Sequence, residues 1–314
     1  MVVEPRVKLS GEVAEAAWIA DRLSRFDSGV VTSVVPGGFE AYARVLHPVE
    51  EPWPGEDRPV RWAEVAAWSG VPLVPGGQFP DIALPEQEPA GVGLWSGRPQ
   101  EGTLYRPDAD VLVEVLAGHT NTPQRGWFGV WDGWGPSSPG PRVKLPGRDY
   151  LLFVGPLAAM SSLVDAQEGR TPNLWWPDDR AWCVASEIDL PWTYVGGSAV
   201  LIADVLADAR VEAQLASPGD NFHQRPPDWL EPAIARAATE LLDSGEATLH
   251  TWRGTVRMQL ERPQHRTSGS LRTERERPDG RHRGSGWMRI CEHDPDRLRD
   301  IVTLSLTSAV IELM

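Results

Sequence analysis

Five carboxylates offer the most direct route to chemistry in this chain. Asp178 and Asp179 are adjacent, Glu187 and Asp189 follow closely, and Asp132 stands in an earlier Trp-Asp-Gly turn. Oxygen ligands of this kind can bind Mg²⁺ or Ca²⁺, and two carboxyl groups can work as acid and base. The spacing partly disfavours both metal binding and acid–base catalysis. Glu187 and Asp189 share one face of a predicted strand, whereas the aspartate pair precedes that strand in a loop. Two aspartates in such a loop are also typical of a solvated turn.

His119 is the one histidine whose surroundings suggest a role. It begins the sequence His-Thr-Asn-Thr-Pro after a predicted helix. A helix C-terminus favours the protonated imidazole, so this position suits either a reactive histidine or a helix-capping one. Capping is the simpler explanation.

Motifs for other chemistries are missing from the sequence. It has no phosphate loop, no His-Glu-x-x-His pattern and no dinucleotide fingerprint. Gly196-Gly197-Ser198 at a helix start could present N–H groups to an anion, but every capped helix does so. Cys183 and Cys291 have apolar neighbours and fit reduced core thiols. We therefore predict no metal site and no cofactor.

Tryptophan is the most unusual feature of the composition. The chain has 15, and seven lie between Trp127 and Trp192. Trp127 and Trp182 fall within predicted strands and are expected in the core. The others of interest stand at glycine or proline breaks, where an indole ring could line a pocket rim. They are Trp131, Trp134, Trp175 and Trp176.

Helices and short strands alternate irregularly along the first two thirds of the chain. Periodicity predicts an amphipathic helix over residues 13–26, and further helices over 62–68, 108–116 and 199–207, the last capped by Ser198. Hairpins are expected from 30–35 with 39–46 and from 143–145 with 150–154. Strands are expected from 127 and over 181–188. The pattern indicates an α+β fold, mainly an antiparallel sheet with flanking helices.

Two segments interrupt this pattern. Residues 70–102 are rich in Pro and Gly and suggest a long surface excursion, which could act as a mobile lid. Polar residues with Pro218, Gly219, Pro226 and Pro227 indicate a linker over 216–228. We therefore divide the chain into a Trp-rich α+β domain over 1–215 and a small C-terminal α/β domain over 229–314.

The small domain is predicted to run helix, strand, strand, helix. The expected elements are a helix over 229–242, strands over 247–260 and 287–291, and a helix that starts at Asp294. Residues 262–289 contain eight arginines and three acids. That composition predicts a flexible basic loop.

Charge and hydropathy exclude some partners. A net charge of −14 disfavours nucleic-acid binding by the whole chain, because phosphate contacts need a basic surface. No apolar run approaches the roughly 18 residues of a membrane span, and the first ten residues do not resemble a signal peptide. We expect a cytoplasmic protein with no membrane contact.

Two stretches resemble a group of uncharacterised actinobacterial proteins. The first contains Trp-Asp-Gly at Trp131, and the second runs through Asn-Leu-Trp-Trp-Pro, Arg-Ala-Trp, Glu-Ile-Asp and Tyr-Val-Gly-Gly-Ser, ending at Ser198. The resemblance extends from about residue 10 to about residue 215. It implies no particular activity, cofactor or catalytic residue.

The sequence favours a non-catalytic recognition protein over an enzyme. It would bind a protein partner or a small ligand, and an antitoxin-like or regulatory role would suit the charge because an acidic surface can steer association with a basic target. One alternative is a hydrolase, metal-assisted or not, that uses Asp178, Asp179 and Asp132 near His119. A weaker alternative is nucleic-acid contact through the arginine-rich segment. The proposed binding face consists of Trp131, Asp132, Trp134, Trp175, Trp176, Asp178 and Asp179.

Overall fold

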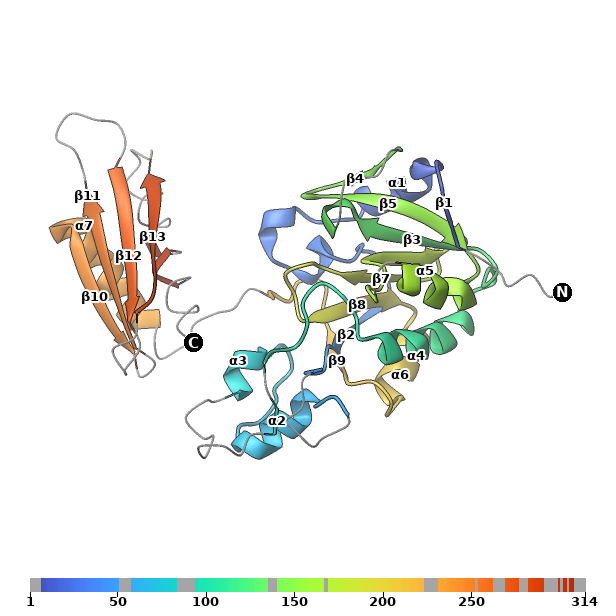
Figure 1. Ribbon diagram of the computed structural model, residues 1–314, viewed down its shortest axis with the longest axis horizontal. Helices are drawn as coiled ribbons and strands as arrows, with labels where there is room; N and C mark the ends of the chain where they lie inside the picture. The colour runs from blue at the N-terminus through green and yellow to red at the C-terminus, as the bar shows by residue number, and fades with distance from the viewer. Residues whose placement is uncertain are drawn as a thin grey trace. The chain divides into compact units, whose positions relative to one another are not determined.

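The computed structural model divides the chain into two compact units, Met1–His223 and Gln224–Met314 (Figure 1). Both units combine helices with antiparallel strands, so the fold is α+β as predicted. The described residues are 7–50, 58–83, 94–95, 97–134, 140–166, 169–222, 231–251, 254–261, 269–276 and 282–290, with short pieces between 299 and 307.

A large antiparallel sheet forms the centre of the first unit. Among the described residues it has nine strands, in the order β1-β5-β3-β6-β7-β8-β2-β9, with β4 paired to β5. The strands are β1 (Lys8–Leu9), β2 (Ala41–Leu46), β3 (Gly126–Trp131), β4 (Val143–Leu145), β5 (Arg148–Gly155), β6 (Leu174–Pro177), β7 (Cys183–Ser186), β8 (Trp192–Gly197) and β9 (Ala213–Ala216).

Both faces of this sheet are covered. The helices α4 (Arg106–Ala117), α5 (Met160–Ala166) and α6 (Ala199–Ala207) share one apolar core with one face. The other face packs against α1 (Ala17–Ala20), α2 (Trp62–Ser69) and α3 (Phe79–Ile82). Figure 1 shows α4, α5 and α6 gathered beside the sheet and α2 with α3 in a separate group. Because side chains alternate along a strand, the central strands β2, β3, β6, β7 and β8 supply both cores.

The two adjacent tryptophans of β6 lie in these two cores. Trp175 packs edge-on against Trp182 with ring centroids 5.6 Å apart, whereas Trp176 meets Trp18 at 6.3 Å on the opposite face. Each is only 1% exposed. β6 is a central strand between β3 and β7, so neither side chain can reach solvent. The prediction that Trp175 and Trp176 rim a pocket is therefore wrong.

The N-terminal segment also differs from its prediction. The expected helix over 13–26 is shortened to a 3₁₀ turn at Val13–Ala16 followed by α1. The expected strand over 30–35 contains a 3₁₀ turn at Val31–Ser33, and β2 pairs with β8 and β9 instead of forming a hairpin with it. The N–H groups of Val31 and Thr32 donate to the carbonyls of Asp220 and Pro218. This β-branched run is thus held by residues distant in the sequence.

Other elements match their predictions. α2, α4, the β4–β5 hairpin and α6 are all present, and Ser198 Oγ accepts a hydrogen bond from Leu201 N at 3.2 Å. Trp127 and Trp182 are in the core as expected, with 1% and 0% exposure. The prediction that residues 70–102 run over the surface is wrong in part. Phe79, Ile82 and Trp95 of this segment are buried in the core.

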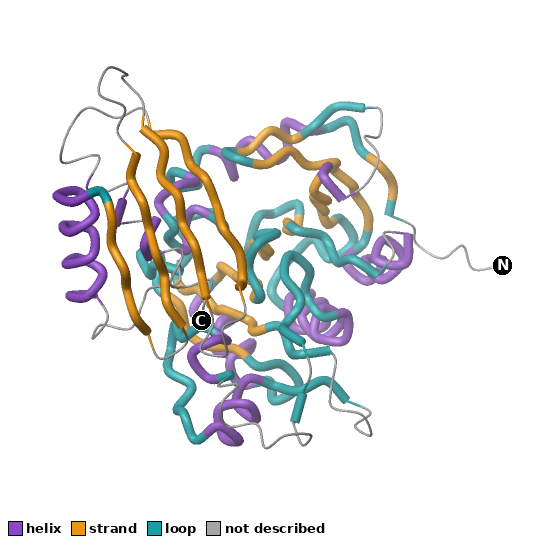
Figure 2. The backbone as a smooth tube through the Cα atoms, turned by 60° about the vertical axis from the view of Figure 1, so that its left-hand side comes forward, coloured by secondary structure: helices purple, strands orange, loops and turns teal. Residues whose placement is uncertain are grey.

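The second unit is a four-stranded antiparallel meander with a helix along it (Figure 2). Its apolar core joins helix and strand residues with Val302 and Leu306 near the end of the chain. The predicted flexible basic loop is wrong over most of its length, because β12 and β13 occupy it. The described elements are α7 (Glu231–Ser244), β10 (Glu246–Thr251), β11 (Gly254–Glu261), β12 (Gly269–Glu276) and β13 (His282–Ile290). Asp294, the predicted helix start, lies outside the described residues.

The burial of the β6 tryptophans predicts a large effect on stability. Replacing either Trp175 or Trp176 by alanine should lower the free energy of unfolding by about 3–5 kcal/mol, because each change removes a large buried ring and leaves a cavity. Urea denaturation followed by circular dichroism measures this. The control is Leu215→Ala at a residue that is 63% exposed, which should change stability by less than about 0.5 kcal/mol. A folded tryptophan variant of unchanged stability would contradict the packing.

Candidate functional site

The carboxylates singled out in the sequence do not come together. Asp178 Oδ1 accepts hydrogen bonds from Trp127 Nε1 at 2.9 Å and Arg125 Nε at 3.0 Å, near the start of β3. Asp132 follows the other end of β3, where it pairs with Arg142 at 2.9 Å. Six strand residues span roughly 20 Å, so Asp132 is remote from Asp178.

The remaining candidate acids and His119 also have local partners. Asp179 accepts hydrogen bonds from Thr120 Oγ1 at 2.8 Å and Asn121 N at 2.7 Å, which fixes the loop after α4. His119 Nε2 lies 2.9 Å from Asp204 Oδ2. Within the described residues no group of three or more His, Cys, Asp or Glu side chains is arranged to hold a metal ion. The geometry therefore does not assemble the hydrolase site suggested above.

Glu187 and Asp189, which follow β7, both form ion pairs with Arg148 at the start of β5. Arg148 Nη2 lies 2.6 Å from Glu187 and 3.0 Å from Asp189. Burial raises the pKa of Glu187 above its ordinary value. This cluster stabilises the end of β7 against β5.

Trp131 and Trp134 are the partly exposed tryptophans of the predicted face. Their rings meet edge-on at 5.3 Å, and Trp134 Nε1 donates to Asn173 Oδ1 at 3.1 Å. The same oxygen accepts Trp131 N at 2.9 Å. Asn173 thus holds the turn in shape, and a binding role for the two indoles stays a prediction.

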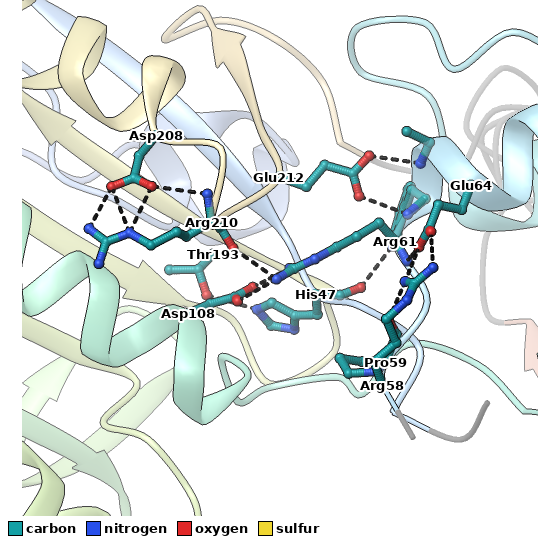
Figure 3. Close-up of polar contacts among 12 residues, drawn as sticks. His47, Arg58, Pro59, Arg61, Glu64, Asp108, Thr193, Asp208, Arg210 and Glu212 are labelled. Atoms are coloured by element: carbon teal, nitrogen blue, oxygen red, sulfur yellow. Dashed lines mark hydrogen bonds and ion pairs between the residues drawn. The ribbon is translucent and has the colours of Figure 1, made fainter. Parts of the chain in front are cut away.

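An ion-pair network fastens α2 to the body of the first unit (Figure 3). Arg61 donates to both carboxylate oxygens of Asp108, at 2.6 and 2.8 Å, and to the carbonyl of Arg210 at 3.0 Å. Glu212 accepts the first amides of α2, Trp62 N at 2.7 Å and Ala63 N at 2.8 Å. Burial raises the pKa of Asp108, although Arg61 acts in the opposite direction. Every charge in this network has a partner, so its role is structural.

His47 is the centre of a buried hydrogen-bond chain. Its Nδ1 lies 2.7 Å from the carbonyl of Gln100, which can only accept, so Nδ1 carries the proton and Nε2 accepts from Thr193 Oγ1 at 2.8 Å. Thr193 Oγ1 in turn lies 2.6 Å from Ser186 Oγ. Burial lowers the pKa of His47 to about 4. With exposures of 1%, 0% and 3%, these side chains are closed to a substrate.

Arg44 differs from these groups because most of its hydrogen-bonding capacity is unused. It lies on β2 and is only 4% exposed. Its guanidinium carbon stacks 3.7 Å from the ring centroid of Trp192, and Trp62 lies at 5.5 Å. Nη1 donates to the carbonyl of Gly77 at 2.9 Å, but Nε and Nη2 are buried and have no hydrogen-bond partner. Burial lowers the pKa of Arg44 to about 10, so it is still charged at neutral pH.

Arg44 lines a small pocket in the first unit. Its cavity volume is about 20 Å³. Buried or half-buried residues form its interior, whereas Gly76, Leu215, Asp220 and Asn221 at its mouth are exposed. Its interior is lined by Val31, Arg44, Gln78, Tyr194, Ala216 and Phe222.

Two segments that looked irregular in the sequence build this pocket. The turn at 74–77 brings the carbonyl of Gly77 to Arg44, and Gly76 allows it with φ +76° while its N–H donates to Gln214 Oε1 at 3.3 Å. The opposite wall is the first half of the predicted linker. There Phe222 N donates to Gly29 O at 2.8 Å and Asn221 forms a bridge with Val30. Residues 217–222 therefore belong to the first unit.

The chain matches no protein-family model, no curated protein and no solved structure. No helix in the described part of the chain is both long and apolar enough to cross a membrane. A functional proposal therefore depends on the geometry of the chain's own residues.

The sequence did carry one overlooked signal for this site. Arg44 interrupts the otherwise apolar run Ala-Tyr-Ala-Arg-Val-Leu, and it shares a face with Tyr42 and Leu46. A charged residue on the core-facing side of a strand needs a partner. Tyr194, Gln78 and Asp220 gave no comparable signal, because only the fold brings them to Arg44.

The His47 chain predicts a pH dependence of stability. His47 is neutral in the folded protein, whereas in the unfolded chain it takes up a proton near its ordinary pKa of 6.5. Stability from this group is complete above pH 6.5 and falls as the pH drops toward 4, by roughly 3 kcal/mol in total. Chemical denaturation at several pH values measures the slope. His47→Gln, whose amide can donate to Gln100 and accept from Thr193, should remove it, and an equal slope in that variant would contradict this assignment.

Asp108 should contribute strongly to the free energy of unfolding. Asp108→Asn keeps the shape but leaves the Arg61 charge without its counterion, and we expect a loss of about 3 kcal/mol in the free energy of unfolding. The control is Asp149→Asn. Asp149 pairs with Lys144 on the exposed surface, and this pair should contribute less than about 1 kcal/mol. Equal effects in guanidinium denaturation would show that the Arg61 pair is no stronger than a surface pair.

Proposed function

We propose that this protein is a non-catalytic recognition protein that binds a small anionic ligand in the Arg44 pocket. The observation that carries the proposal is a buried guanidinium with two unpartnered N–H-bearing nitrogens in the lining of a pocket. Buried charges in proteins are normally paired and hydrogen-bonded. An anion from solution would supply the missing partner.

The energetics support an occupant. Removing an ion from water costs several kcal/mol even after the protein relaxes. Stacking on Trp192 returns roughly 2 kcal/mol, and the bond to Gly77 returns about 1.5–3 kcal/mol because the donor is charged. Two further buried donors remain unsatisfied, which adds a penalty that an anionic ligand removes when it binds. Part of the binding free energy is thus stored in the free protein.

Binding without catalysis suits the pocket's chemistry. Its described lining has no histidine, cysteine, serine or threonine, and its one carboxylate, Asp220, is exposed to solvent. Burial raises the pKa of Tyr194 to about 12, so its hydroxyl stays protonated at neutral pH. Arg44 keeps its proton as well, and both groups can donate hydrogen bonds but not accept a proton.

We prefer binding of a small ligand to binding of a protein partner through the predicted aromatic and acidic face. Trp175 and Trp176 are buried, and β3 separates Asp132 from Asp178 and Asp179, so the seven residues do not form one continuous face. Nothing in the geometry favours the antitoxin-like role, the hydrolase or nucleic-acid contact. A cytoplasmic location is part of the proposal and rests on cysteine usage, since Cys183 is a buried free thiol.

Replacement of Arg44 tests the proposal. Wild-type protein should show a higher midpoint of thermal unfolding with at least one member of a panel of small anions, namely acetate, benzoate, sulfate and inorganic phosphate. Arg44→Met should weaken that binding at least tenfold, because it removes the charge and both donors. Without ligand the variant should be at least as stable as wild type, since an unpaired buried charge is lost.

The matched control is Arg22→Met. Arg22 also lies over an indole, 5.3 Å from the ring of Trp18, but it is exposed and lies outside the pocket. It should leave binding unchanged. The proposal fails when no anion in the panel distinguishes wild type from Arg44→Met.

A further inference from the structure

We infer that the turn at residues 74–77 is a gate over Arg44, with Gln214 as its latch, and that an anion reaches the guanidinium only when this turn moves away. The inference rests on the proposed function and concerns how access to that site is controlled. Three features carry it: a closed cavity smaller than the ligand, firm bonding of the other walls, and the few contacts that hold the turn.

The closed protein has no room for an anion beside Arg44. The cavity volume is about 20 Å³, and roughly 10–15 Å³ is needed to hold one water molecule. Acetate and sulfate are several times larger than water. The two nitrogens that lack partners, Nε and Nη2, are buried. Part of the wall must therefore move before an anion can contact them.

Most of the wall is firmly bonded. Arg44, Tyr194 and Ala216 lie on the paired strands β2, β8 and β9. The segment 218–222 is fastened to residues 29–32 by backbone hydrogen bonds of 2.8, 3.1 and 3.2 Å. Movement of either part would break a sheet or several backbone hydrogen bonds at once.

The turn at 74–77 is a preformed unit. Gly77 N donates to Val74 O at 3.0 Å, Pro75 occupies the second position, and Gly76 occupies the third with φ +76°. These are the features of a type II turn, whose backbone is fixed by its own proline and glycine. The turn can therefore move as one piece about the residues that flank it.

Few of the described contacts hold this turn against the rest of the unit. Gln214 makes two of them, because it accepts from Gly76 N at 3.3 Å and donates to Val74 O at 3.4 Å, and both bonds are long. Val74 is 53% exposed, so its side chain adds little apolar burial. The third contact is the hydrogen bond from Arg44 to Gly77 O at 2.9 Å. This turn is thus the wall that opens most easily.

A gate of this kind couples the ligand to the surface of the protein. Because acetate and sulfate exceed the closed cavity, the turn stays displaced while either is bound. The exposed Val74 moves with the turn, so the free and bound states present different surfaces. A ligand that binds only the open state shifts the population toward it.

A buried thiol measures opening without any ligand. Val31→Cys places a thiol in the pocket lining at a residue that is 1% exposed, and Cys291→Ser leaves the fully buried Cys183 as the only other thiol. Iodoacetamide should label the introduced thiol slowly, because it reacts only when the turn is open. Adding Gln214→Ala should raise the labelling rate about two- to tenfold, the range that corresponds to the loss of one net hydrogen bond. Gln259→Ala, at an exposed strand glutamine of the second unit, should leave the rate unchanged.

Gly76→Ala loosens the turn by a second route. The φ of +76° disfavours any side chain, whereas the space around a new Cβ is open. This variant should raise the labelling rate at least about twofold. Gly169→Ala is the matched control, because Gly169 has φ +87°, equally open surroundings and a place outside the pocket lining. Unchanged labelling in both Gln214→Ala and Gly76→Ala overturns the gate.

Anion binding separates the gate from the proposed function. An anion of the panel that binds at Arg44 should bind Gln214→Ala more tightly than wild type, in the same proportion as the labelling rate, because a larger fraction of the protein is open. Arg44-dependent binding of equal affinity in both proteins, with unchanged labelling, overturns the gate and leaves the proposed function standing. Faster labelling without Arg44-dependent binding of acetate, benzoate, sulfate or phosphate overturns the proposed function, and the gate falls with it because it has no ligand to admit.

Discussion

Burial of both faces of the nine-stranded sheet is the constraint on which the rest of this structure depends. A sheet covered on both sides has no solvent-facing strand side chains in its middle, so every residue of a central strand must suit an interior. The adjacent Trp175 and Trp176 illustrate this, because successive residues point into different cores. Trp175 and Trp176, which the sequence suggested for a pocket rim, pack instead in the two cores.

Polar groups inside such a sheet must find partners, and most of them do. His47 is satisfied by Gln100 and Thr193, and Asp108 is satisfied by Arg61. Arg44 is the informative departure, because its guanidinium keeps two unpartnered nitrogens while it stacks on Trp192. An unsatisfied buried charge beside a pocket has a plain physical explanation if the pocket's ligand is the partner.

The acidic residues show the opposite behaviour. Asp132, Asp178 and Asp179 each bind a nearby arginine, indole or loop amide. Their closeness in sequence or motif suggested a shared site, but β3 separates the first from the other two. Asp178 and Asp132 have their partners near opposite ends of β3, and Asp179 holds the loop after α4.

The sequence by itself determined the elements whose patterns are local. α2, α4, α6 and the β4–β5 hairpin follow from periodicity, capping and turn residues that lie within a few positions of one another. What only the tertiary structure decided is which strands pair and which side chains meet. Residues 30–35 bind the chain near 220 instead of forming a hairpin, and that pairing places the wall of the Arg44 pocket. The physical reason is that long-range strand pairing is set by burial of the whole sheet, and no single segment encodes it.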